Sequence, residues 1–173
     1  MRKNFFRHLI FNLAFLSFCF PVFAQNEDET PSTEDLMAVF SMQFDITAPD
    51  TSFTQTEQGW AEASTQSQIA CSALPASFER VMQDFNDFTL PEGMRMVSKD
   101  SLTIEGVTGF LVVTEATPPE EEPNQEHFYT LMYLRPWDKK ITLNINAAYP
   151  KSQHDRLYQK ILATFATVRK KEK

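Results

Sequence analysis

The sequence predicts an α+β fold, in which one twisted antiparallel sheet of about six strands packs with two helices. Two observations lead to this fold class. Apolar residues at alternating positions mark strands through most of residues 94–150, with turn signals between them. Apolar residues at helical spacing mark one helix before these strands, at about 75–88, and one after them, at about 152–170.

Residues 1–24 are predicted to be a secretory signal peptide. Three basic residues open this segment, an apolar stretch follows, and the small residue Ala24 precedes the expected cleavage site. The alternative is an uncleaved anchor, but the apolar stretch is shorter than the roughly 20 residues that a bilayer core needs. The bulky Phe18 disfavours lipid attachment at Cys19. We therefore expect a periplasmic or secreted protein with no stable membrane insertion after cleavage.

The remainder is expected to form a single domain. An acidic flexible leader occupies 25–39, the folded domain 40–169 and a basic tail 170–173. The chain has a net charge of −7, which becomes −10 when the three basic residues of the signal peptide are removed. Such an acidic protein is a poor candidate for binding nucleic acid or anionic lipid.

The first half of the domain is expected to contain short strands and one helix. A strand is predicted at about 42–47, ended by Pro49. A second strand places Cys71 on one face with Ile69 and Ala73. Cys71 is the single cysteine after cleavage, so no internal disulfide forms, and without a basic neighbour it is expected to be a buried apolar residue.

The helix at about 75–88 has Pro75 near its first turn and carries one apolar stripe. An aromatic and methionine stripe of this kind is expected to pack in the core. Its members are Phe78, Val81, Met82, Phe85 and Phe88.

Two glycines, Gly106 and Gly109, bound the connection between the strand segments 94–106 and 108–116. A phosphate-binding glycine loop would need a following helix and a nearby Lys, and the segment after Gly109 is instead β-branched and aromatic. The two glycines are therefore predicted to provide the backbone freedom of a tight connection between strands.

Residues 117–126 are predicted to be a loop, because they contain three prolines and four glutamates. A cation site formed by Glu120, Glu121 and Glu122 is disfavoured, since consecutive carboxylates on an extended chain do not converge on one point. Two strands follow, at 126–137 and 139–150, and the first is expected to be central because both its faces are apolar. The closing helix is amphipathic, and its basic tail is expected to lie at the helix C-terminus, where the dipole favours positive charge.

These elements resemble the PsbP-like superfamily, which includes the Mog-type Ran-binding proteins and bacterial DcrB-like domains. The resemblance covers about residues 40–168 and rests on the helix entry ALPASFERVMQDF, the segment LTIEGVTGFLVV, two long strands ending INAAYP and the final helix ending near FATV. It implies a sandwich of sheet and helices. Members of the family are non-enzymatic binding modules such as photosystem subunits, chaperones and immunity proteins, so it implies no catalytic residues.

The sequence therefore predicts a non-catalytic protein that binds another protein, with no cofactor and no metal. One alternative is an immunity protein whose acidic surface meets the basic cleft of a secreted toxin. The other is a hydrolase that uses His127 or His154, although no nucleophile elbow or zinc motif accompanies them. Candidate interface residues are the aromatic side chains Trp60, Trp137 and Tyr149. The sequence carries no indication of an oligomeric state.

Overall fold

The computed structural model describes residues 33–171, apart from residues 41, 58, 87–88 and 119–124. The predicted signal peptide and residues 25–32 of the predicted leader lie outside the described residues. The elements in chain order are α2 (Thr33–Phe40), β1 (Phe44–Asp45), β2 (Thr54–Gln55), β3 (Gly59–Glu62), β4 (Ser67–Leu74), α3 (Phe78–Asn86), β5 (Met94–Ile104), β6 (Val107–Ala116), β7 (Phe128–Pro136), β8 (Thr142–Pro150), a 3₁₀ turn (Lys151–Gln153), α4 (His154–Phe165) and β9 (Arg169–Lys170).

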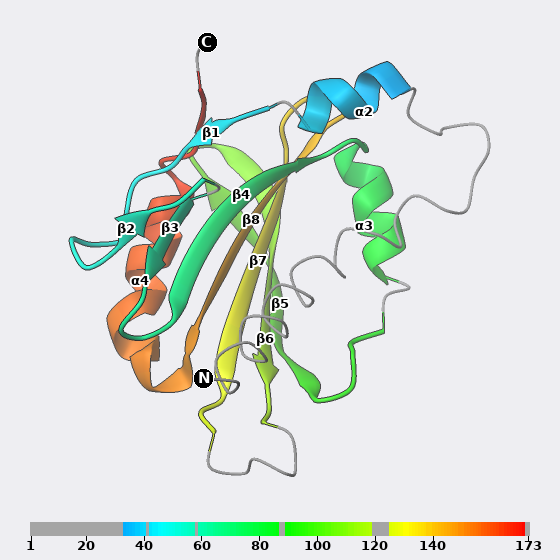
Figure 1. Ribbon diagram of the computed structural model, residues 1–173. Helices are drawn as coiled ribbons and strands as arrows, with labels where there is room; N and C mark the ends of the chain where they lie inside the picture. Colours follow the sequence, from blue (N-terminus) through cyan, green and yellow to red (C-terminus); the bar gives the residue numbers. More distant parts are fainter. Residues whose placement is uncertain (1–32, 41, 58, 87–88, 119–124, 172–173) are drawn as a thin grey trace.

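Seven strands form one antiparallel sheet in the order β2-β3-β4-β8-β7-β6-β5 (Figure 1). The predicted α+β class is confirmed, and the sheet has more strands than the predicted six or so. The sheet contains two short strands, β2 and β3, that were not predicted, because strands of two and four residues are too short to show a clear alternating pattern. The strand predicted at about 42–47 is only the two-residue β1, which lies outside this sheet. Strand β8 lies in the middle of the sheet and is buried at all nine positions, with β7 beside it.

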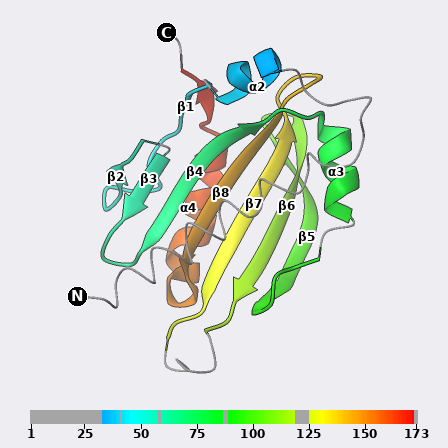
Figure 2. The same ribbon diagram turned by 45° about the vertical axis from the view of Figure 1, so that its right-hand side comes forward.

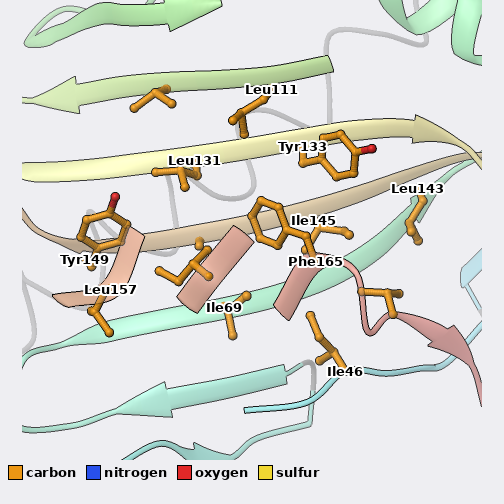
Figure 3. Packing of buried hydrophobic residues seen from close by; sticks show 14 of the residues in the cluster. Ile46, Ile69, Leu111, Leu131, Tyr133, Leu143, Ile145, Tyr149, Leu157 and Phe165 are labelled. Atoms are coloured by element: carbon orange, nitrogen blue, oxygen red, sulfur yellow. The ribbon is translucent and has the colours of Figure 1, made fainter. Parts of the chain in front are cut away.

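The two faces of the sheet are covered differently, as the turned view in Figure 2 shows. Helix α4 packs across one face and closes the main core, where the ring of Tyr133 stacks on that of Phe165 at a centroid distance of 5.8 Å (Figure 3). Helix α3 covers part of the other face and closes a smaller core around Val112 and Met132. Large side chains buried in this way each contribute about 1.5–3 kcal/mol.

Helix α3 confirms the predicted apolar stripe over the described residues, and Phe88 lies outside them. The helix begins at Phe78, because the hydroxyl of Ser77 accepts a hydrogen bond from the Arg80 amide at 3.2 Å and so caps the first turn. Pro75 therefore precedes the helix and does not lie within it.

The ends of the domain differ from the sequence prediction. Helix α2 occupies residues 33–40, most of which the sequence assigned to a flexible leader, and its Val39 is buried. Helix α4 ends at Phe165, and the segment Arg169–Lys170 is a strand that pairs with β1 in a separate two-stranded sheet. The chain reverses between them, where the Thr167 hydroxyl accepts a hydrogen bond from the Thr47 amide at 2.9 Å. The basic residues 169–170 thus lie beyond the helix, although the Arg169 guanidinium still donates to the carbonyl of the C-cap residue Ala166 at 2.9 Å.

The two glycines of the β5–β6 connection have different environments. Gly106 lies in the two-residue turn with φ of 80°, next to Glu105 with φ of 51°, which is a geometry that favours glycine. Gly109 lies inside β6, where an added Cβ would come within 2.4 Å of the Leu134 carbonyl oxygen and 2.6 Å of the Tyr133 ring. Gly106 therefore serves the turn, and Gly109 allows close packing of β7.

Candidate functional site

The candidate site is centred on Glu115, a carboxylate at the end of β6 that is only 1 % exposed. Register pairing places Arg95 of β5 on one side of it and Tyr129 of β7 on the other. Two further side chains reach the carboxylate from outside the strands: His127 lies just before β7, and Lys151 lies just after β8. We call Arg95, Glu115, His127 and Lys151 the Glu115 cluster.

Both oxygens of the Glu115 carboxylate are occupied. Oε1 is 2.8 Å from His127 Nδ1 and 2.9 Å from Lys151 Nζ, and Oε2 bonds with Arg95. The backbone completes the arrangement, because the Lys151 amide donates to the His127 carbonyl at 2.8 Å. The carboxylate therefore fixes three side chains that come from three separate segments of the chain.

The Glu115 cluster contains more positive than negative charge, and its positive side chains are exposed to solvent. The hydrogen bond from Lys151 holds the pKa of Glu115 below its usual range despite burial, and the same bond raises the pKa of Lys151. Glu115 is therefore ionised near neutral pH and cannot act as a general acid there. The side chains of Arg95, Lys151 and His127 are 60, 47 and 43 % exposed, so their remaining donors face outward.

An aromatic group adjoins the cluster. The Lys151 ammonium lies 5.7 Å from the centre of the Tyr129 ring, and this ring meets that of His154 edge-on at 5.0 Å. His154 in turn lies 4.9 Å from Tyr158, and its Nδ1 is 3.1 Å from the buried Tyr149 hydroxyl. The aromatic rings restrict the orientation of the Lys151 side chain and form an apolar border beside the exposed cations.

A second ionic cluster ties α4 to the edge of the sheet. Arg156 of α4 bonds with Glu62 of β3 and lies 3.3 Å from Asp50, and Lys160 lies 2.8 Å from Asp50. Burial by itself would raise the pKa of Glu62, but the bonds from Arg156 and Thr65 outweigh it and the pKa is lowered. We call Asp50, Glu62, Arg156 and Lys160 the Glu62 cluster. Its two acids and two bases balance.

The structure brings the two predicted histidines to the same end of the sheet but gives them different neighbours. His127 bonds with Glu115, and His154 bonds with Tyr149. Within the described part of the chain, the hydrogen bonds of their rings include none to a serine, threonine or cysteine. Neither histidine is therefore arranged with a nucleophile as in a hydrolase triad.

Sequence reasoning missed Glu115, Arg95 and Lys151. A signal for the first was present, because Leu111, Val113 and Glu115 occur at alternating positions and the period of two places all three on the core face. A charge at an inward position of a strand requires partners. Nothing in the sequence indicates that Arg95 and Lys151 supply them.

The three predicted interface aromatics lie in separate places. Trp60 is half-buried in β3, donates its indole N–H to the Ile46 carbonyl at 2.6 Å and borders a shallow pocket of about 520 Å³. Trp137 is half-buried in the β7–β8 turn. Tyr149 is 0 % exposed, so it offers no surface to a partner.

Cys71 is half-buried, and burial raises the pKa of its thiol to about 12, which keeps it neutral and unreactive. Among the described residues no group of three or more His, Cys, Asp or Glu side chains is placed to hold a metal ion. The loop glutamates Glu120, Glu121 and Glu122 lie outside the described residues. No helix in the described ranges has the length and apolar character needed to cross a membrane.

Several solved structures are similar to this chain. LpqN, described as involved in cell envelope biogenesis of Mycobacterium tuberculosis, is 11 % identical with a TM-score of 0.51, over 76 % of this chain and 85 % of its own. The cyanobacterial PsbP (CyanoP) of Synechocystis sp. PCC 6803 is 6 % identical with a TM-score of 0.47, over 81 % of this chain and 89 % of its own. A protein of Bacteroides thetaiotaomicron is 9 % identical with a TM-score of 0.48, over 76 % of this chain, which spans about half (49 %) of that protein.

No family model matches the chain, and no curated protein matches it in sequence. The predicted resemblance to the PsbP-like fold is confirmed by the likeness to LpqN, and at 11 % identity it concerns the fold alone.

Proposed function

We propose that this protein is a non-catalytic binding module that engages an acidic segment of another protein through the Glu115 cluster. One observation carries the proposal. A single buried carboxylate holds two permanent cations and one histidine at the surface, and this local excess of positive charge belongs to a chain whose net charge is −7.

The geometry suits recognition better than catalysis. Long cationic side chains normally lose conformational freedom when they bind a partner, which costs about 0.5–1.5 kcal/mol each. In the Glu115 cluster, Arg95 and Lys151 are already oriented by the carboxylate, so part of this cost is absent. The donors that remain exposed suit carboxylates of a partner, and Tyr129 and Tyr158 provide apolar contact beside them.

The surrounding negative charge supplies selectivity. The net charge of −7 disfavours encounters with an acidic partner in general, whereas the cations of the Glu115 cluster attract it, which favours encounters in which the partner meets this cluster. Because the cations are exposed, this attraction is screened by salt at separations beyond about 8–10 Å. Association should therefore slow as ionic strength rises.

The test is capture of partners from envelope and secreted fractions by the immobilised protein, with identification by mass spectrometry. We expect one dominant acidic protein to be retained by the wild type and weakened about tenfold by Arg95→Gln combined with Lys151→Gln. Affinity is then measured with the purified partner at low and moderate salt.

The matched control is Lys170→Gln combined with Lys171→Gln, which removes the same charge from exposed positions in and next to β9. This variant should bind the partner as the wild type does. Equal weakening by both variants would show that only net charge matters and would contradict a site at the Glu115 cluster. Turnover of a generic ester, glycan or peptide by the wild type, abolished in His127→Ala, would contradict a non-catalytic role.

We also infer that the protein acts outside the cytoplasm, as the predicted signal peptide implies. Intact mass measurement of the protein recovered from an envelope fraction should show a chain that begins at Gln25. Recovery of the full-length chain from the cytoplasm would contradict export without bearing on the binding site.

A further inference from the structure

The end of the sheet opposite the Glu115 cluster contains a buried arginine without an anionic partner. Arg135 lies near the end of β7, opposite Leu143 of β8, and is only 7 % exposed. Its Nε is fully buried and has no hydrogen-bond partner. Throughout the described part of the chain no carboxylate lies within ion-pair distance of its guanidinium, whereas Arg95 and Arg156 both bond with acids.

The neighbours of Arg135 do not compensate its charge. Its Cζ lies 6.0 Å from the centre of the Trp137 ring, at the limit of a cation–π contact. The guanidinium also acts on Cys71 and Tyr133, but burial raises the pKa of both groups and keeps them neutral. The nearest acid along the chain, Asp138, accepts a hydrogen bond from the Lys140 amide at 2.7 Å within its own turn.

An arginine cannot escape this situation by losing its proton, because its pKa exceeds 12. A buried charge without a partner is strongly unfavourable unless a counter-ion reaches it. Nε is enclosed, and among the described residues no hydrogen bond is made to the two Nη groups, so the residual exposure of Arg135 lies at the outer part of its guanidinium. An anion can therefore approach this outer part from solvent.

We propose that Arg135, bordered by Trp137, binds the carboxylate of a ligand or partner. A carboxylate carries one charge and is planar, so it matches one guanidinium with two parallel hydrogen bonds. A phosphate monoester would bring about two charges to a place where, in the part of the chain that the structure describes, Arg135 is the one buried cation. The indole of Trp137 is held in place by Phe44, whose ring meets it edge-on at 5.4 Å, so one side of the site is rigid.

The carboxylate belongs either to a free small acid or to an aspartate or glutamate side chain of a bound polypeptide, and the test separates these sources. Sodium acetate and a short peptide with one central aspartate are titrated into the full protein at constant ionic strength, with sodium chloride as the reference salt. The readouts are the NMR signal of the Arg135 Nε–H group and the midpoint of thermal unfolding.

We expect the Nε–H signal to shift with saturation and the midpoint to rise by about 4 °C at tenfold excess over the dissociation constant. A response to acetate identifies the free acid as sufficient. A response to the peptide alone identifies a polypeptide source. An Nε–H signal that neither probe moves would overturn the proposal.

Variants test whether the carboxylate binds at Arg135 or at another cation of the protein. Arg135→Gln should abolish the response, and Arg135→Lys, which keeps the charge but loses the fork, should weaken binding at least tenfold. Lys140→Gln in the exposed turn and Lys170→Gln in β9 should bind the probe within twofold of wild type. If Arg135→Gln does not fold, the affinity of Arg135→Lys relative to wild type decides whether Arg135 binds the carboxylate. An unchanged response in the Arg135 variants would place the carboxylate elsewhere and overturn the site.

Discussion

The Glu115 and Glu62 clusters are built from the same kinds of side chain but differ in charge balance. In the Glu62 cluster two acids meet two bases, and both bases belong to α4, so the cluster fastens that helix to the edge of the sheet. In the Glu115 cluster one acid meets two permanent cations and a histidine from three segments. A balanced cluster holds structure, whereas an unbalanced one also presents charge that a partner can use.

The largest effect on stability is expected for Glu115→Gln. This substitution removes the negative charge that Arg95, Lys151 and His127 share and leaves the two permanent cations close together without it, so the free energy of unfolding should fall by about 3 kcal/mol. Urea unfolding followed by tryptophan fluorescence measures the change. Glu105→Gln, which removes an exposed pair with Arg169, is the control and should cost less than about 0.5 kcal/mol. Equal costs would show that Glu115 does not organise its cluster.

A smaller loss, about 2 kcal/mol, is expected for Arg156→Gln, because Glu62 then remains almost buried without a cation, while Asp50 keeps Lys160. The same urea experiment measures it. Lys160→Gln should cost less, since Asp50 still bonds with Ser52 and lies near Arg156. Partner binding should be unchanged in both variants, and weakened binding in Arg156→Gln would contradict the division of roles between the two clusters.

Acid should destabilise both clusters gradually. The pKa values of Glu115 and Glu62 are lowered in the folded protein from 4.5, and that of Asp50 is lowered from 3.8. Groups of this kind stabilise the fold above their unfolded pKa, and the contribution is lost as the pH falls below it toward the folded value. Unfolding free energies measured from pH 7 to pH 3 should therefore decline mainly below about 4.5. Glu115→Gln should decline less steeply than wild type, and an identical slope would show that Glu115 is not linked to folding.

The sequence alone determined the elements with strong periodicity. The paired strands β5 to β8, the apolar stripe of α3 and the amphipathic α4 follow from alternation and helical spacing, because burial of one face imposes these periods locally. The short elements were predicted less well. Strand β1 lies within the strand predicted at about 42–47 but has only two residues, and the two-residue strands β2 and β9 were not predicted. Such short strands form because the surrounding structure brings them together.

The candidate sites, in contrast, could not be predicted from local sequence patterns. The position of Glu115 at an inward place of β6 can be read from the sequence, but its partners Arg95, His127 and Lys151 are 20, 12 and 36 residues away. Likewise, nothing local shows that Arg135 is buried without a counter-ion. Periodicity in the sequence shows which way a side chain faces. The balance of charges around that side chain depends on sheet register and helix packing. Only the tertiary structure therefore decided where this protein carries an excess of positive charge.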